Sequence, residues 1–246
     1  MKSFIKLSSF FIMVLGILLI FPLGEKAVYA QNIQGGLNLL MGMPQEEFKD
    51  NIGTRKFGGS IWGGYQFRHS PVLAGLELDY YMYGRTKRTE FFNDYIPEVN
   101  VDVSTTYNIL TAHTFLRFML NSNEIIPYFD CLIGFNYLYT RTSVSDDNDI
   151  SNSIAATTNH DDIAFSYGFG WGCMLSLYNN QNRYNDRKPF AVLLNVRFRY
   201  LLGGEAEYLR KGSLTTSGHR ILYDVFKSRT DMLTMQIGVN VKFNIR

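Results

Sequence analysis

The stretch LTMQIGVNVKF, residues Leu233–Phe243, alternates without a break between apolar residues and residues that are polar or lack a side chain. A β-strand points successive side chains to opposite faces, so this stretch predicts one strand with an apolar face and a polar face. If the apolar face meets lipid and the polar face lines a closed lumen, this last strand seals a barrel.

Seven further stretches carry strand signals, and with the last one they predict an all-β, eight-stranded antiparallel up-and-down transmembrane β-barrel. Turn residues separate them, as in His69-Ser70-Pro71 and Asn121-Ser122-Asn123-Glu124. The predicted strands before the closing strand are Ile33–Met41, Phe57–Arg68, Leu73–Tyr83, Val103–Leu120, Pro127–Thr142, Ile163–Tyr178 and Pro189–Leu202.

The links between the predicted strands alternate in length. Short turns follow the second, fourth and sixth strands, whereas long loops follow the others, at Gly42–Lys56, Gly84–Asp102, Ser143–Asp162 and Gly203–Ser228. Outer-membrane barrels place short turns on the periplasmic side and long loops outside, and a soluble sandwich has no reason to sort its loops in this way. The alternation therefore predicts a barrel in the cell outer membrane.

The direction of the apolar face needs a separate argument, because a soluble lipocalin-like barrel also alternates. On the predicted seventh strand, apolar Val196 and Phe198 oppose Arg197 and Arg199. The polar faces mix glycine with charges of both signs, aromatic residues collect near strand ends, and the strands are longer than most soluble ones. These features favour apolar-out packing, although Phe115 and Ile109 blur the pattern and Trp62 is expected to point inward.

The 246 residues suit one all-β domain after an N-terminal signal. Residues 1–30 combine basic Lys2 and Lys6 with the apolar run Phe10–Phe21 and the cleavage pattern Val28-Tyr29-Ala30, which predicts a signal peptide and leaves residues 31–246 as the barrel. A short N-terminal membrane anchor is the alternative. The signal segment carries the whole net charge of +2, so the mature chain is near neutral and no nucleic-acid partner is expected.

Three short motifs resemble the outer membrane β-barrel domain proteins of Bacteroidetes-type bacteria, which are small OmpA/OmpX-like barrels. They are Ile126-Pro127-Tyr128 opening a strand that runs to Asn136, Tyr208–Ser213 in the fourth long loop, and Ser228–Asp231 before Ile237-Gly238-Val239. The resemblance covers nearly the whole mature chain and implies an eight-stranded barrel but no single activity. Such barrels usually end on an aromatic residue that the insertion machinery reads, so either Phe243 serves from an internal position or the signal is weak.

An eight-stranded barrel leaves a lumen just wide enough for side chains to fill. Buried charges must be paired, so we expect the inward charged residues to form a structural ion-pair network. A gated polar path, a small-ligand site and catalysis are the alternatives. The network residues are Arg68, Glu77, Asp79, His113, Arg117, Asp130, Arg197, Arg199 and Lys242.

No catalytic group, metal site or cofactor is predicted. Barrel enzymes need an acid, a base or a nucleophile grouped at the outer rim, and the histidines here are scattered. His160 beside Asp161 and Asp162 is the nearest approach to a cluster, and we interpret it as a solvated acidic turn. We therefore expect a non-enzymatic barrel.

The long loops carry the charges that could meet a partner. The third loop is acidic, whereas the second holds Arg85, Lys87 and Arg88 and the fourth is also basic. Loops on a rigid scaffold carry function, so the expected partners are outer-membrane lipid and lipopolysaccharide, the insertion machinery, and a surface ligand or protein. The loops could pair with each other or hold divalent ions, although the spacing of a calcium loop is absent.

The two cysteines, Cys131 and Cys173, fall on the predicted lipid faces of neighbouring strands. They lie at similar distances from the middle of the third loop, so the sequence allows them to stand nearly opposite each other. Two free thiols in lipid and a cross-strand disulfide both remain open at this point, because disulfide geometry is demanding.

Overall fold

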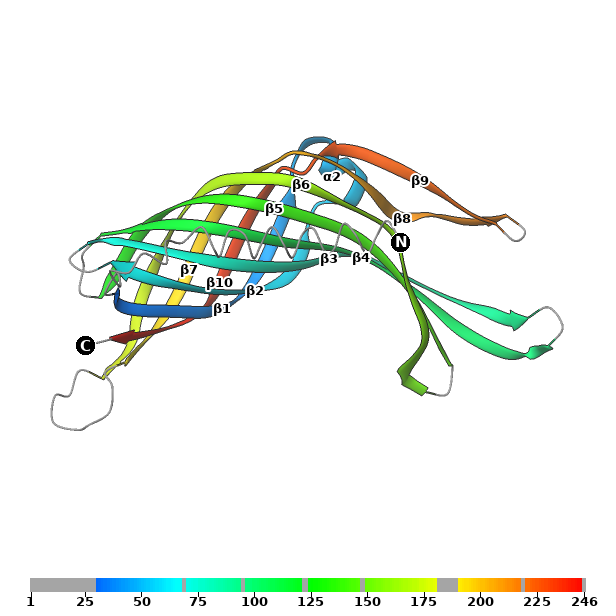
Figure 1. Cartoon of the computed structure of the whole chain (residues 1–246), viewed down its shortest axis with the longest axis horizontal. Coiled ribbons are helices and arrows are strands. Elements are labelled where there is room, and N and C mark those ends of the chain that lie inside the picture. Colours follow the sequence, from blue (N-terminus) through cyan, green and yellow to red (C-terminus); the bar gives the residue numbers. More distant parts are fainter. Residues whose placement is uncertain are drawn as a thin grey trace, which may run out of the picture.

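The structure is a computed structural model that describes residues 30–67, 70–93, 96–120, 124–146, 149–180, 190–217 and 220–244. Residues 1–29 lie outside this range, so the signal peptide and its boundary stay predictions. Eight antiparallel strands close into a barrel in the order β1-β10-β7-β6-β5-β4-β3-β2 (Figure 1), which confirms the predicted fold class. The barrel strands are β1 Ala30–Pro44, β2 Lys56–Phe67, β3 Val72–Asn93, β4 Ile96–Met119, β5 Ile125–Asp146, β6 Asp149–Asn180, β7 Phe190–Gly203 and β10 Met232–Asn244.

The closing strand β10 pairs with β1 on one side and with β7 on the other. Its register sets Val239 opposite Leu37, and both side chains are exposed on the outer surface, at 46% and 65% of their area. Gln236 and Asn240 lie on the opposite face of β10 and are buried in the lumen. A slip of one residue would exchange the two faces, so the alternation excludes such a slip, whereas the choice among registers that differ by two residues depends on the partner strands.

Two of the predicted long loops are continuations of barrel strands. β3 and β4 remain paired beyond the predicted end of the third strand, with Arg85 opposite Thr106 and Thr86 opposite Thr105, and β5 and β6 continue in the same way. The prediction of loops at residues 84–102 and 143–162 was therefore wrong. Threonine and valine favour strands, and the paired backbone satisfies its own hydrogen bonds outside the lipid as well as inside it.

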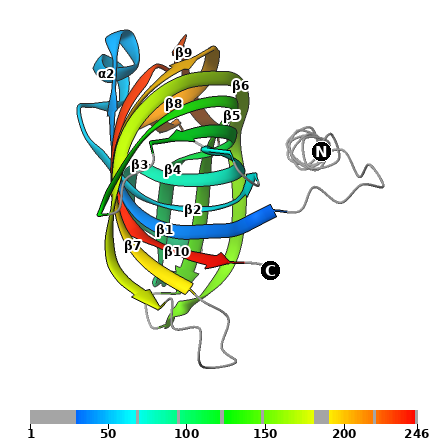
Figure 2. The same ribbon diagram turned by 90° about the vertical axis from the view of Figure 1, so that its left-hand side faces the viewer.

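The other two long loops contain elements of their own. The first holds helix α2, Glu46–Ile52, and the fourth holds the hairpin of β8, Glu205–Ser217, and β9, Arg220–Arg229, which form a separate sheet. We call the end of the barrel that carries these elements the hairpin end, and the opposite end, with its short links, the turn end. Figure 2, viewed from the turn end, shows the ring of strands with α2 at its rim.

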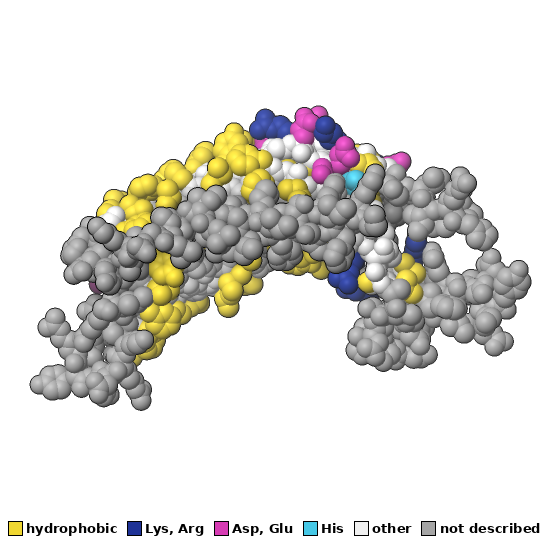
Figure 3. Space-filling model, viewed as in Figure 1, with side chains coloured by type: hydrophobic (Ala, Val, Ile, Leu, Met, Phe, Trp, Pro, Cys, Tyr) yellow, Lys and Arg dark blue, Asp and Glu magenta, His cyan; other side chains and the backbone are white. Residues whose placement is uncertain are grey.

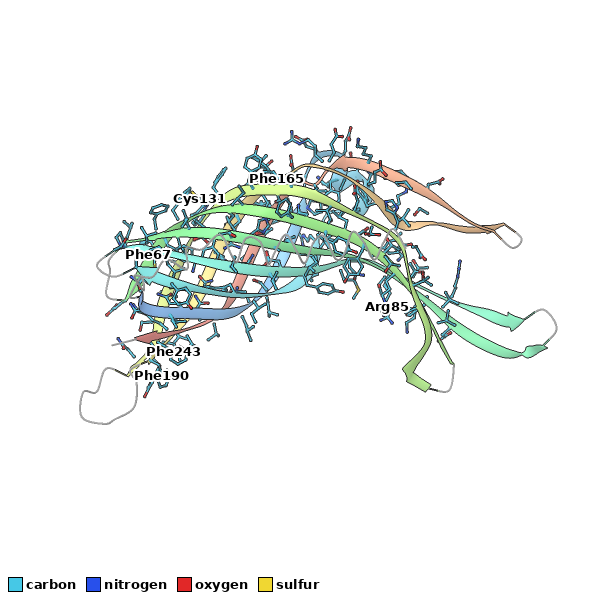
Figure 4. The ribbon with its side chains drawn as sticks, in the orientation of Figure 1. Phe67, Arg85, Cys131, Phe165, Phe190 and Phe243 are labelled. Atoms are coloured by element: carbon cyan, nitrogen blue, oxygen red, sulfur yellow. The ribbon has the colours of Figure 1, made fainter. Side chains whose placement is uncertain are left out.

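Apolar side chains form a band on the barrel face drawn in Figure 3, and exposed charged side chains gather toward the hairpin end. The rings of Trp171 and Phe198 stack at 4.9 Å between centroids within this band. Phe67, Phe190 and Phe243 lie at the turn end, and Phe165 lies nearer the hairpin end (Figure 4). Exposed members of the band include Leu37, Leu39, Ile61, Tyr65, Leu78, Phe118, Phe129, Ile133, Phe165, Phe169, Trp171 and Ile237.

Among the described residues, no helix has both the length and the apolar character that a membrane crossing requires.

The two cysteines lie on neighbouring strands but not opposite each other. Cys131 pairs with Phe169, whereas Cys173 pairs with Pro127, and both thiols are free. Four residues along a strand span about 13 Å, well beyond the separation of about 7 Å that a disulfide tolerates between Cα atoms. The expectation that the two cysteines stand nearly opposite was wrong, because a sheet's register cannot be read from distances to a loop.

Candidate functional site

The lumen of the barrel is filled by side chains, and strand β6 makes the room for them. Gly170 and Gly172 stand opposite Arg199 and Arg197 of β7. A Cβ atom at Gly170 would lie 2.4 Å from Cγ of Arg199, and one at Gly172 would lie 2.7 Å from Cβ of Arg197. Both contacts are shorter than van der Waals packing allows, so β6 contributes a bare backbone against which the arginine stems pack.

Two carboxylates hold three arginines together across the lumen. Nε and an amino group of Arg117 on β4 donate to the two oxygens of Asp130 on β5, at 2.7 and 2.9 Å. Arg199 on β7 donates to Asp130 at 2.9 Å and to Glu77 on β3 at 2.8 Å. All of these side chains are at most 2% exposed. The bidentate pair and the bridging arginine are the strong form of a buried ion pair, since each charge meets an opposite charge with good geometry.

Glu77 is the meeting point of the second half of the network. Its Oε1 also accepts hydrogen bonds from an amino group of Arg197 and from the hydroxyl of Ser60, the latter at 2.9 Å. Nε of Arg197 donates to the amide oxygen of Gln236 on β10 at 2.7 Å. Side chains from β2, β3, β4, β5, β7 and β10 are thereby joined through one network, which ties opposite walls of the barrel together.

An aromatic cage surrounds the guanidinium of Arg117. Its Cζ atom lies 3.9 Å from the ring centre of Tyr128, 4.8 Å from that of Trp62 and 5.2 Å from that of Phe115. The inward position predicted for Trp62 is confirmed, at 3% exposure, and Phe115 also points inward. These rings belong to an apolar layer that also contains Leu73, Met119, Leu132, Met174, Leu193 and Leu201, and this layer shares the turn end of the lumen with the polar side chains of Asn32, Gln34 and Gln66.

The remaining predicted network residues form none of the ion pairs described above. His113 is buried and its Nε2 lies 3.1 Å from the hydroxyl of Ser166. Asp79 lies in the lumen beside Glu77, but neither of its oxygens accepts a hydrogen bond from the described residues. Lys242 is partly buried and takes part in none of the ion pairs within the described ranges, and Arg68 lies outside them.

Uncharged residues of the lumen complete the network, and reasoning from charge alone missed them. The hydroxyl of Tyr128 donates to Asn195 at 2.5 Å, Asn195 donates to Asn38 at 3.4 Å, and the indole nitrogen of Trp62 donates to Asn240 at 3.3 Å. Asn38, Asn195 and Asn240 all stand on polar faces that the alternation identifies. Their positions were therefore visible in the sequence, although their partners on other strands were not.

A second apolar layer closes the lumen at the hairpin end, and we call it the lid. Helix α2 contributes Phe48, which is fully buried and meets the ring of Tyr208 of β8 edge-on at 5.2 Å. The hydroxyl of Tyr208 accepts a hydrogen bond from Asn51 at 2.9 Å and lies 2.7 Å from that of Ser228. Barrel residues beneath the lid include Leu40, Tyr81, Ile109, Leu138, Ala164 and Met232.

A tight connection folds the β8–β9 hairpin across the mouth of the barrel. A Cβ atom at Gly203 would lie 2.0 Å from Oγ1 of Thr230, so only glycine allows this approach. The amide of Gly203 donates to a carboxylate oxygen of Asp231 at 2.7 Å, and the amide of Gly204 donates to the carbonyl of Phe165 at 2.7 Å. These bonds fix the base of the hairpin to β6 and β10.

The segment His160–Asp162 is part of strand β6, so its interpretation as a solvated turn was wrong. Nε2 of His160 lies 3.2 Å from the carbonyl oxygen of Glu207. The backbone amide of Glu207 donates a hydrogen bond to a carboxylate oxygen of Asp162 at 2.9 Å. The hydroxyl of Tyr137 donates to Asp161 at 3.4 Å. The contacts of His160 and Asp162 with Glu207 connect β8 to the barrel wall, and the bond from Tyr137 to Asp161 joins β5 to β6.

The arrangement as a whole is a charged middle layer between two apolar layers. Within the described ranges, no three His, Cys, Asp or Glu side chains are grouped so that they could hold a metal ion. The carboxylates and the histidine of the lumen lie between the aromatic layer and the lid.

Comparisons with known proteins agree with this architecture. Residues 14–243 match the model of a family described as outer membrane protein beta-barrel domain. Among solved structures, Neisserial surface protein A is 12% identical, with 87% of this chain and 96% of that chain covered and a TM-score of 0.38. No curated protein sequence matches the chain.

Two further solved structures are similar at the same low level of identity. Ail, the attachment invasion locus protein of Yersinia pestis, is 12% identical with a TM-score of 0.33, and the match covers 87% of this chain and 99% of that chain. The N-terminal β-barrel domain of Pseudomonas aeruginosa OprF is also 12% identical, with 88% and 98% covered and a TM-score of 0.29. Because the family model spans most of the sequence, this chain belongs to the outer membrane protein beta-barrel domain family and is a protein of the outer membrane.

Proposed function

We propose that this protein is a non-enzymatic integral barrel with a side-chain-filled lumen, which holds its long hairpins at the cell surface for a structural or surface-interaction role. The observation that carries the proposal is Arg199, which donates to both Glu77 and Asp130 and so crosses the middle of the lumen. The predicted network residues act in this proposal as a structural plug. The apolar layer at the turn end and the lid, which lie on either side of the network, support this proposal.

The proposal includes the partners that such a barrel would meet. Lipid contacts the apolar band, lipopolysaccharide meets the hairpin end, and the insertion machinery reads the closing strand, which carries the exposed Phe243 near its end. A signal peptide over residues 1–30 would direct the chain to the envelope. The hairpins continue as paired strands beyond the barrel, so any surface ligand or protein would meet a β-structured surface rather than unpaired loops.

Conductance in a planar bilayer tests the plug. The folded protein should show no steady conductance, because charged side chains and two apolar layers occupy the path. A stable open channel in the wild-type protein would contradict the proposal and favour the alternative of a narrow pore. Mass spectra of lipid A from a deletion strain test the second alternative, a lipid-modifying enzyme, and an altered acylation pattern would support that alternative.

A further inference from the structure

A row of exposed cations lies on the outer face of the barrel just beyond the apolar band. Arg85 of β3 stands opposite Thr106 of β4, which stands opposite Arg141 of β5, so the threonine separates the two arginines across three strands. Lys87 takes the next outward position on β3, opposite Ser104. We call Arg85, Lys87 and Arg141 with these two hydroxyl residues the basic row.

The strand geometry turns the basic row toward the lipid side of the wall. The register between β3 and β4 shifts between Met82 and Gly84, which brings Arg85 and Lys87 to the exposed face while Tyr107 remains buried at 1% exposure. Figure 4 shows Arg85 where the barrel passes into the long hairpins, and Figure 3 shows Lys and Arg side chains where the apolar surface ends. The basic row therefore stands at the edge of the apolar band that faces the hairpin end (Figure 3, Figure 4).

Among the residues that the structure describes, no carboxylate forms an ion pair with a cation of the basic row. Within the described ranges, none of Arg85, Lys87 and Arg141 takes part in an ion pair, and Nε of Arg85 donates to the neutral hydroxyl of Ser104 at 3.2 Å. Asp102 lies one outward position further along β4, between Thr89 and Ser145. Residues directly opposite are about 5 Å apart at Cβ, so the two arginines stand about 10 Å apart and repel each other unless an anion lies between them.

Aromatic and apolar side chains lie directly below the basic row. Tyr80 is 39% exposed, and its hydroxyl donates to Asn108 at 2.7 Å, while Tyr139 stands opposite Asn108 on the other side. Below them the band continues through Leu78 and Ile133, which are 42% and 54% exposed. One surface thus offers contacts for acyl chains, then aromatic rings, then cations and hydroxyls, in the order in which a membrane lipid presents its parts.

From this sequence of surfaces we infer that the basic row binds the phosphate groups of a lipid A-type phosphorylated glycolipid in the outer leaflet. Arginine matches a phosphate bidentately, and Arg85, Lys87 and Arg141 are all exposed on this face. The acyl chains of the same molecule would lie on the apolar band. The inference rests on the proposed function, because the hairpin end must face outward for the basic row to meet this leaflet.

Titration of the full-length protein in detergent micelles with purified lipid A tests the inference, with quenching of intrinsic fluorescence as the readout. The test variant is Arg85→Ser with Arg141→Ser. The matched control is Lys49→Ser with Arg55→Ser, which removes the same charge from exposed residues outside the basic row. A cation at a membrane surface contributes about 1 kcal/mol, so the test variant should bind about 25-fold more weakly while the control binds as the wild type does.

Dephosphorylated lipid A and inorganic pyrophosphate complete the design. Dephosphorylated lipid A should bind the wild type as weakly as lipid A binds the test variant, and pyrophosphate alone should not compete at equal concentration, since it lacks acyl chains. Equal affinity of wild type and test variant, an equal loss in the control variant, or unchanged binding of dephosphorylated lipid A would overturn the inference. If the protein folds and does not conduct, any of these results refutes the basic row alone and leaves the proposed function standing.

Discussion

At the scale of single residues, Asp130 and Asp79 of the lumen are expected to contribute very differently to stability. Asp130 accepts hydrogen bonds from Arg117 and Arg199, whereas neither oxygen of Asp79 accepts one from the described residues. Removing one partner of a buried ion pair costs about 3 to 5 kcal/mol, because the other charge stays buried without an opposite charge beside it. Asp130→Asn should lower the free energy of unfolding by about 3 kcal/mol or more, and Asp79→Asn should change it by less than about 1 kcal/mol. Urea unfolding in lipid vesicles measures both, and equal losses would refute the plug in this form.

Glycine at β6 gives a second test at this scale. A methyl group at Gly170 meets the stem of Arg199, so Gly170→Ala should cost about 1 to 3 kcal/mol through overpacking. Gly63 of β2 is the matched control, because a Cβ atom there meets nothing within 4 Å. Gly63→Ala should leave the urea midpoint unchanged or raise it slightly. If Gly170→Ala lowers the free energy of unfolding less than Gly63→Ala does, the lumen is more loosely packed than this contact requires.

At the scale of elements, helix α2 and the β8–β9 hairpin cover the barrel without completing its sheet. The eight-stranded ring is closed through β1 and β10, and the hairpin forms a separate sheet. The lid is therefore held by side chains such as Phe48 and Tyr208 and by a few backbone bonds at its base. Elements held in this way open more readily than the sheet they cover.

Truncation of Phe48 should release the lid and leave the barrel intact. Phe48→Ala removes a fully buried ring from the contact with Tyr208, so limited proteolysis should cut near α2 while the heat-resistant barrel band on gels is unchanged. The neighbouring exposed Lys49 supplies the control, since Lys49→Ala removes a side chain of similar length with no buried contact. Equal protease sensitivity of both variants would show that Phe48 does not hold the lid.

At the scale of the whole molecule, charge lies inside and apolar surface lies outside. Residues such as Leu37, Leu39 and Trp171 are more than 60% exposed, whereas Arg117 and Arg197 are fully buried. Exposed apolar area of this extent belongs in lipid rather than in water. The folded protein should therefore precipitate when detergent is removed, as light scattering and gel filtration would show. A folded monomer that stays soluble in plain buffer would contradict the membrane assignment.

The eight strands and their two faces follow from the sequence alone, because alternation with period two records which side of a strand meets lipid. Arg197 and Arg199 could be placed in the lumen from their neighbours Val196 and Phe198 for this reason. The same local pattern also located Trp62 and the closing strand. Hydrophobic alternation is a property of each strand by itself, so it needs no knowledge of the partner strands.

What joins one strand to another was decided only by the tertiary structure. The register placed Cys131 opposite Phe169, brought Glu77 to two arginines more than a hundred residues away, and folded the β8–β9 hairpin over the mouth. Backbone pairing also continued beyond the lipid, where composition suggested loops. The physical reason is that hydrogen bonds between strands and contacts across the lumen depend on closure of the ring, and no short stretch of sequence encodes closure.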